Sequence, residues 1–144
     1  MKFSSLITAL TIILMAHPAN ASEKANRVIE AAKKSCTLEK GQFSVPEIST
    51  TSVDLNSDGN PDEIIDESKF TCSTSSSLYC GTGGCMLHLI VDGKDYKYLA
   101  KEWTIAQLGA AKILIIGNHW SECNYKNPCL RAITWRDGRF NGLK

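Results

Sequence analysis

Residues 54 to 62 read DLNSDGNPD, a stretch in which oxygen-bearing side chains recur at alternate positions. Gly59 stands at its sixth position and can take the positive φ that a tight wrap needs. Several carboxylates in a flexible wrap suit Ca²⁺ better than Mg²⁺, which demands near-octahedral geometry and keeps most of its water. The spacing therefore predicts a calcium site. Its expected ligands are the side chains of Asp54, Asn56, Asp58 and Asp62 and the backbone carbonyl of Asn60.

An ordinary turn is the alternative for this stretch, because Asp, Asn and Gly also dominate hairpin turns that bind no ion. Ligand-type residues at the right offsets, together with Gly59, favour the ion site. Exported modules bind calcium at roughly 10⁻⁴ to 10⁻³ M, in media where the ion is plentiful. We therefore expect a structural ion rather than a regulatory one.

The six cysteines are the next residues with a chemistry of their own, and an even count in a small exported chain favours disulfides. Six cysteines allow 15 pairings. Proximity along the chain favours Cys80 with Cys85 and Cys123 with Cys129, which leaves Cys36 for Cys72. Zinc is the rival use, but zinc motifs bring two close pairs of ligands and need free thiolates.

The segment C-G-T-G-G-C from Cys80 to Cys85 has two interpretations. Successive glycine amides could cradle an anion or an oxyanion. The segment lacks the Lys and Ser/Thr of a P-loop and the spacing of a dinucleotide fingerprint. A turn closed by a disulfide is the favoured interpretation.

Two histidines are candidates for acid–base chemistry. His88 lies inside the apolar run M-L-H-L-I-V, where we expect a buried, hydrogen-bonded histidine rather than a catalytic base. His119 follows the apolar run I-L-I-I-G and has Trp120, Ser121 and Glu122 beside it. No set of nucleophile, base and orienting group can be assembled from adjacency along the chain.

The elements that must position these residues begin with a helix. From Ser22 to about Leu38, apolar residues recur at steps of three and four, which places them along one helical face. Ser22 is the expected N-cap, and Gly41, just beyond the periodic residues, is the expected stop signal.

Beyond Gly41 the pattern changes to short strands separated by turn residues. Asp92-Gly93 and Asp137-Gly138 each predict a tight hairpin turn. The segment Trp103 to Leu108 fits either a strand or a short helical turn. Together these elements predict an α+β fold, with an N-terminal helix packed on a mainly antiparallel, disulfide-stapled sheet. The expected strands are Ile48 to Leu55, Glu63 to Asp66, Met86 to Val91, Tyr96 to Ala100, Lys112 to Gly117, Leu130 to Trp135 and Arg139 to Phe140.

The start of the chain reads as a secretory signal. Lys2 precedes an uncharged apolar run from Leu6 to Ala16, and Ala19-Asn20-Ala21 forms a small-x-small cleavage site. A run of about eleven residues is too short for a membrane-spanning helix, which needs roughly 20. We therefore expect residues 1–21 to be a signal peptide and 22–144 to form one domain, exported to the periplasm or secreted.

Charge excludes some classes of partner. The 144-residue chain has a formal net charge of +1. Removal of residues 1–21 takes away Lys2 and leaves 15 basic and 15 acidic residues. Neither nucleic acid nor a membrane surface is favoured as a partner by this balance, and no later apolar run approaches spanning length.

The predicted loop lies between two expected strands and resembles the calcium loops of FG-GAP and VCBS-type repeat proteins. An EF-hand would need a helix on each side and a glutamate at position 12, where this chain has Ile65. The order of the loop, Cys72, the C-G-T-G-G-C segment, Trp103, His119, Cys123 and Cys129 resembles a group of small exported bacterial proteins without an assigned activity. The resemblance implies export and a calcium loop, but no catalytic residues.

Two functions follow from these patterns. The first is an exported calcium-binding protein of non-catalytic type, a binding or inhibitor module whose partner is an extracellular or envelope protein. The alternative is a small secreted hydrolase that uses His119 with a nearby acid such as Glu122.

Overall fold

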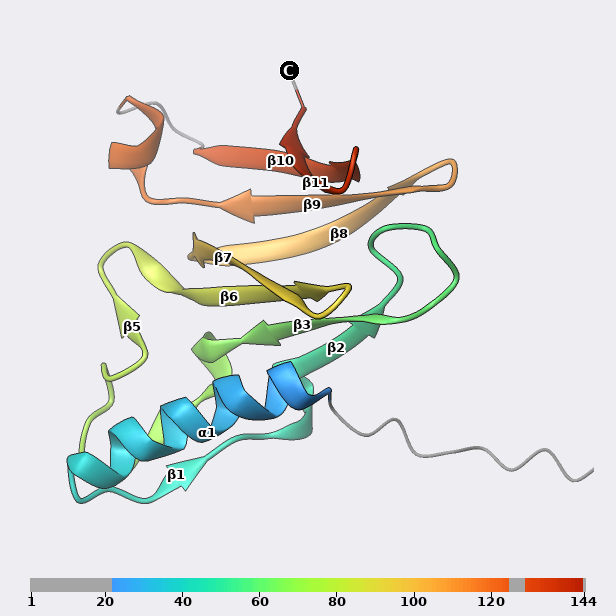
Figure 1. The fold of residues 1–144 in the computed structure, drawn as a ribbon. Coiled ribbons are helices and arrows are strands. Elements are labelled where there is room, and N and C mark those ends of the chain that lie inside the picture. Colours follow the sequence, from blue (N-terminus) through green and yellow to red (C-terminus); the bar gives the residue numbers. More distant parts are fainter. Residues whose placement is uncertain (1–21, 125–128, 144) are drawn as a thin grey trace, which may run out of the picture.

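The computed structural model describes residues 22–124 and 129–143, so the predicted signal peptide lies outside the described residues. Figure 1 shows one long helix, α1 (Glu23–Leu38), beside a set of antiparallel strands. The strands are β1 (Phe43–Ser44), β2 (Thr50–Val53), β3 (Asp62–Asp66), β4 (Thr71–Cys72), β5 (Cys80–Gly81), β6 (Gly84–Val91), β7 (Lys94–Ala100), β8 (Glu102–Leu108), β9 (Ala111–Gly117), β10 (Leu130–Arg136) and β11 (Arg139–Gly142). Short 3₁₀ helices are η1 (Glu47–Ser49), η2 (Glu67–Lys69) and η3 (Trp120–Cys123). Among the described residues, no helix has the length and apolar character needed to cross a membrane.

The strands form two main sheets. One has the order β2-β3-β6-β5, with β7 also paired to β6, and the other has the order β11-β10-β9-β8. Strands β1 and β4 form a small separate pair. All of these pairings are antiparallel, as the sequence predicts for most of the sheet.

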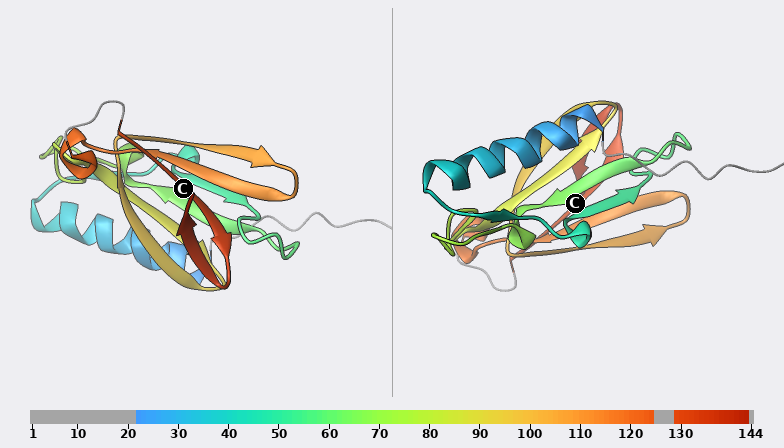
Figure 2. Two further views of the ribbon diagram at one scale, coloured as in Figure 1. Left: turned by 90° about the horizontal axis from the view of Figure 1, so that it is seen from above. Right: turned by 90° about the horizontal axis from the view of Figure 1, so that it is seen from below.

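Two hydrophobic clusters lie on opposite faces of β3 and β6. Ile64 and Leu89 belong to a cluster with residues of the second sheet, such as Ile116. Ile65 and Ile90 belong to a cluster with α1 residues, because successive strand residues point to opposite faces. Figure 2 shows the resulting layers, with α1 along one side of the strands and β8 to β11 on the other.

The helix begins where the sequence predicts. The Ser22 hydroxyl accepts a hydrogen bond from the Ala25 amide at 3.2 Å, which satisfies one of the first free amides. The helix ends at Leu38, as the periodicity predicts, but Lys40 rather than Gly41 takes the positive φ of 56° that follows the last turn. Gly41 is needed for space: a Cβ there would lie 2.3 Å from the Cys72 sulfur.

The strand predictions are confirmed with shifted ends. The expected strand from Ile48 starts at Thr50, because Ser49 turns back to bond the Pro46 carbonyl, and it stops at Val53 rather than Leu55. The ambiguous segment Trp103 to Leu108 is strand β8. The two-residue strands β1, β4 and β5 are too short to give a periodic signal.

Both predicted Asp-Gly hairpins are present. Asp92 and Gly93 have φ values of 50° and 71° between β6 and β7. Asp137 and Gly138 have nearly the same values, 55° and 71°, between β10 and β11. Positive φ at both central residues matches the twist of the flanking strands.

Three disulfides join Cys36 to Cys72, Cys80 to Cys85, and Cys123 to Cys129, the pairing that the sequence favours. The first connects α1 to β4 across 36 residues, while the other two close loops of 5 and 6 residues. The C-G-T-G-G-C segment is therefore a disulfide-closed turn, with Cys80 opposite Cys85 and Gly81 opposite Gly84.

We predict that the three bridges differ in their contribution to stability. Loop-closure entropy gives about 4 kcal/mol for the Cys36–Cys72 bridge and about 2 kcal/mol for each short one. Urea unfolding of three double Cys→Ala variants should show this order. Mass spectrometry of the non-reduced protein should find no alkylatable thiol, and two or more would contradict the three-bridge arrangement.

Candidate functional sites

The predicted calcium loop joins β2 to β3. Its neck is closed by the antiparallel pair Val53 and Asp62, the last residue of β2 and the first of β3. Figure 1 shows the loop projecting from one end of the strands. The Ser57 hydroxyl donates to the Ala110 carbonyl at 3.0 Å, which ties the loop to the β8–β9 turn.

The carboxylate of Asp54 organises the loop from inside. Its Oδ1 accepts hydrogen bonds from the amides of Ser57 (2.7 Å) and Asp58 (3.2 Å), and its Oδ2 accepts one from Gly59 (3.0 Å). Asp58 Oδ1 accepts from the Asn60 amide at 2.7 Å. The side chains therefore act as local Asx-type caps of the turn.

Asp62 is buried at the base of the loop, and its Oδ2 accepts from the Leu55 amide at 2.8 Å. Burial raises the pKa of Asp62; backbone hydrogen bonds lower it, and the negative charges of Asp58 and Asp92 raise it further. Hydrogen bonds to Asn60 and Asn56 lower the pKa of Asp58.

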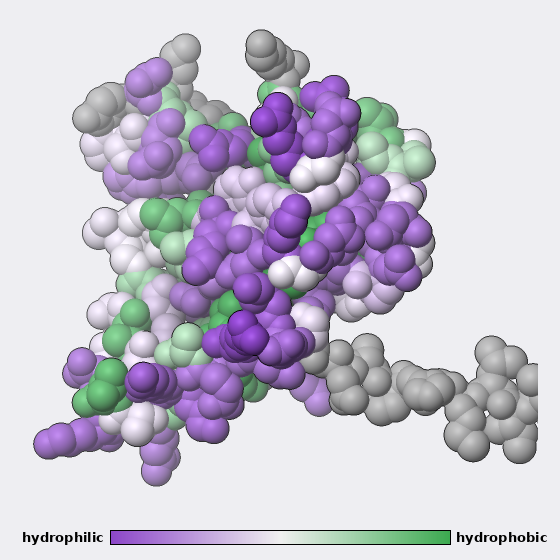
Figure 3. Space-filling view, viewed as in Figure 1, coloured by the Kyte–Doolittle hydropathy of each residue, from purple (hydrophilic) through white to green (hydrophobic). Residues whose placement is uncertain are grey.

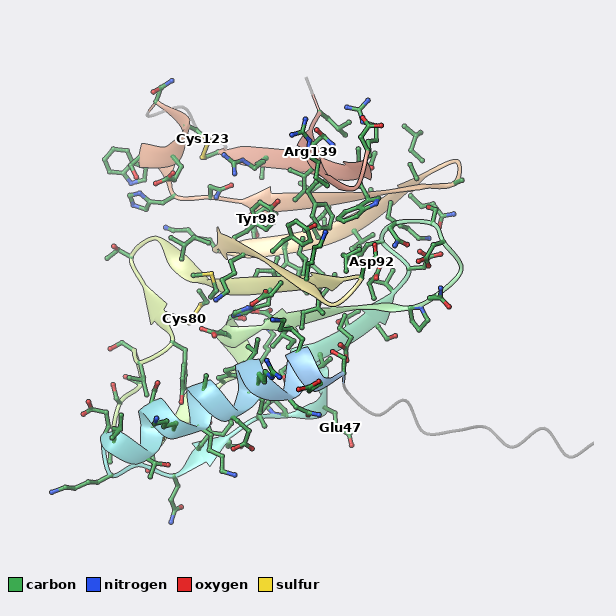
Figure 4. The ribbon with its side chains drawn as sticks, in the orientation of Figure 1. Glu47, Cys80, Asp92, Tyr98, Cys123 and Arg139 are labelled. Atoms are coloured by element: carbon green, nitrogen blue, oxygen red, sulfur yellow. A yellow bond between two sulfur atoms is a disulfide. The ribbon has the colours of Figure 1, made fainter. Side chains whose placement is uncertain are left out.

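Asp92 is the residue that sequence reasoning missed. It lies in the β6–β7 turn, and Figure 4 shows it at the end of the sheet beside the loop. The Asn56 amide nitrogen donates to Asp58 Oδ2 at 3.1 Å and to Asp92 Oδ1 at 3.3 Å. The Asp-Gly dipeptide signals the turn, but only the pairing of β3 with β6 reveals which loop it meets.

The donor types of the loop fit a hard cation, since they are carboxylate, amide and backbone oxygens. In this structure the carboxylates of Asp54 and Asp58 accept hydrogen bonds from the loop's own backbone amides. In the described part of the chain, no group of three or more His, Cys, Asp or Glu side chains is arranged to hold a metal ion. Asn56 would have to turn its amide so that Oδ1, rather than Nδ2, faces Asp58 and Asp92.

His119, the candidate catalytic residue of the alternative function, lies at the start of η3. Its Nδ1 lies 2.8 Å from the Ser121 hydroxyl. The centroid of its ring lies 4.9 Å from that of Trp120, with the two ring planes tilted by 39°. The backbone amide of Glu122 donates to the His119 carbonyl at 2.9 Å. Within residues 22–124 and 129–143, the ring has no carboxylate partner to orient it as a base.

His88 is buried on the face of β6 that α1 covers, as expected for a satisfied histidine. Its Nδ1 lies 3.0 Å from the carboxylate of Asp95, and its Nε2 lies 3.1 Å from Oε1 of Glu67. A neutral imidazole can donate from one nitrogen only, whereas the imidazolium donates from both. Two carboxylates on opposite sides therefore favour the protonated ring.

The pKa of His88 reflects opposing effects. Burial lowers it, but the hydrogen bonds and negative charges of Glu67 and Asp95 outweigh burial and raise the pKa above the ordinary value of 6.5. A raised folded-state pKa adds stability that is complete below about 6.5 and is lost as pH rises through the folded value.

We predict that the free energy of unfolding falls as the pH rises above about 6.5 and through the raised pKa of His88, because the ring then loses one of its two N–H protons and its charge-assisted hydrogen bond. Urea unfolding should show a much smaller fall in the double variant Glu67→Gln, Asp95→Asn, which keeps the ring but removes both charges. An equal fall in the two proteins would contradict this role of His88.

Comparisons with protein-family models, with curated proteins and with solved structures find no match for this chain. The resemblance to FG-GAP and VCBS-type calcium loops therefore remains a prediction from the sequence.

Proposed function

We propose that this chain is an exported calcium-binding protein of non-catalytic type. In this proposal a structural Ca²⁺ fixes the loop from Asp54 to Asp62, and the rigid, disulfide-stapled sheets present their loops to an extracellular or envelope protein. The fold belongs to the α+β class, with α1 packed on the sheet that contains β3 and β6.

One observation carries the proposal: four carboxylates lie at one end of the strands without a basic partner, although they are not arranged around a common centre in this structure. Asp54, Asp58 and Asp62 come from the loop, and Asp92 comes from the β6–β7 turn. Among the described residues, no Lys or Arg forms an ion pair with any of them. A divalent cation would relieve the repulsion among them and use oxygens of the type it prefers.

Export is supported by three disulfides and by the signal-like start of the chain. Disulfides persist in oxidising compartments and are rare in the cytosol of most cells. The periplasm or the extracellular medium also supplies calcium at the concentrations that a weak structural site requires.

A non-catalytic role is favoured over the hydrolase alternative by the surroundings of His119. Its ring is held by Ser121, while the backbone amide of Glu122 donates to the His119 backbone carbonyl and not to the ring. The Ser121 hydroxyl lies within hydrogen-bond reach of the ring, but a general base also needs a group that orients it, and no carboxylate among the described residues bonds the ring.

The face of the molecule in Figure 3 is mostly hydrophilic, with scattered apolar residues. A partner protein would therefore meet this face largely through polar contacts.

We predict a modest calcium-dependent stabilisation. With an assumed dissociation constant of about 0.1 mM, 1 mM Ca²⁺ adds RT ln 11, or about 1.4 kcal/mol, to the free energy of unfolding. The midpoint of thermal unfolding should then rise by a few degrees. Magnesium at the same concentration should shift it much less. Asp58→Ala should abolish the calcium shift and keep the three disulfides.

The two Asp-Gly hairpins provide a matched test of Asp92. Asp92→Asn and Asp137→Asn change the same residue at nearly the same positive φ, which Asn tolerates. Only Asp92→Asn should weaken calcium binding, by about tenfold for a loss of about 1.4 kcal/mol. Equal calcium affinity in both variants would show that Asp92 does not contribute to calcium binding. No calcium shift in the wild-type protein would overturn the proposed function.

A further inference from the structure

A cavity of about 450 Å³ lies under α1, between the helix and the strands that it covers. The cavity is open to solvent, and the helix wall carries small side chains at Ala31, Ala32 and Ser35, which leave room beside the helix. The volume falls within the roughly 300–1,000 Å³ of small-molecule sites. None of the lining residues belongs to the calcium loop.

The helix wall of this cavity carries only cations, whereas the strand side carries both carboxylates and cations. Lys24 and Arg27 line it from α1. Glu67 and Asp95 line it from the strand side, where they flank the buried ring of His88, and Lys97 lines it beside Asp95. Apolar contact surface between them comes from residues such as Val28 and Leu78.

Some of these charges have capacity left for a ligand. Glu67 is only 19% exposed, and its Oε1 faces His88, while its Oε2 has no hydrogen-bond partner among the described residues. Asp95 is shared between His88 and Lys97, whose Nζ lies 3.7 Å away. On the helix wall, Arg27 pairs with Glu23, whereas Lys24 forms no ion pair within the described part of the chain. A half-buried acceptor and an unpaired cation therefore face one cavity.

We propose that this cavity binds a small zwitterion, an amino acid or a molecule of similar chemistry with an amine and a carboxylate. The amine would donate to Glu67, and the carboxylate would lie against Lys24 and Arg27. A simple amine would satisfy Glu67 but face the cations of the helix. A simple acid would pair with Lys24 but leave the Oε2 atom of Glu67 without a donor. A dipolar ligand uses both walls at once.

The test uses probes that separate the two charges. The zwitterions 4-aminobutanoate, 6-aminohexanoate and 8-aminooctanoate cover a range of charge separations, and hexanoate and hexylamine each carry one charge. NMR titration of the purified protein should follow the ring C–H signals of His88, with those of His119 as the internal control. We expect at least one zwitterion to move the His88 signals with a dissociation constant of about 1 mM or tighter, and both single-charge probes to bind at least about tenfold more weakly.

Variants on each wall then localise the binding. Lys24→Gln and Glu67→Gln should each weaken the zwitterion by about tenfold, the effect of losing one charge-assisted contact of about 1.4 kcal/mol. Lys34→Gln changes the same residue type on the same helix outside the cavity and should leave binding unchanged. Amide spectra of all three variants check that the fold is retained.

Three results would overturn the proposal. The first is no saturable shift of His88 with any zwitterion up to about 50 mM, far above the millimolar scale expected. The second is binding of hexanoate or hexylamine as tight as that of the zwitterions. The third is an equal loss of affinity in Lys24→Gln and Lys34→Gln. The calcium experiment tests residues of the loop and of the β6–β7 turn, whereas this one tests residues of the cavity. Either proposal can therefore fail while the other still stands.

Discussion

Burial of β3 and β6 on both faces is the constraint on which the remaining structure depends. Ile64 and Ile65 are adjacent and both fully buried, one toward the second sheet and the other toward α1. A strand covered on both sides is held in one register, because a slip of one residue would exchange its two faces. The loop that precedes β3 and the turn that follows β6 are therefore fixed relative to each other, which places Asp92 beside Asn56.

The same double burial makes a polar residue in β6 costly. His88 occupies a position on the α1 side where an apolar side chain would fit the cluster of Ile65 and Ile90. A buried charge is tolerated when it is paired and hydrogen-bonded, and Glu67 and Asp95 supply both from neighbouring elements. Well-packed apolar residues are often at least as stabilising as such a cluster. The cluster and the cavity beside it therefore suggest a role other than stability.

Structural features that depend only on neighbouring residues in the sequence were predictable. Helical periodicity with Ser22 before it, Asp-Gly turns between apolar runs, and cysteines 5 and 6 residues apart each carry a local physical signal. Of the two partners of His88, Glu67 was not predictable, because it lies 21 residues away and reaches the ring only through the pairing of β3 with β6. The spacing predicts the loop residues as ligands, whereas the place of Asp92 beside Asn56, 36 residues away, needed the register of the sheet.

The two short disulfides and the loop from Asp54 to Asp62 lie at opposite ends of the strands. Figure 4 shows Cys80 and Cys123 at the end opposite Asp92. The two short disulfides fix their own end covalently, while the loop end is held by Asx-type hydrogen bonds to backbone amides and by the Ser57 contact with Ala110. Covalent bridges act mainly on the unfolded chain, whereas an ion bound only by the folded loop would act on the native state. An ion at the loop would therefore stabilise the end of the sheet that no disulfide reaches, and its effect should add to theirs because the two sets of contacts share no residue.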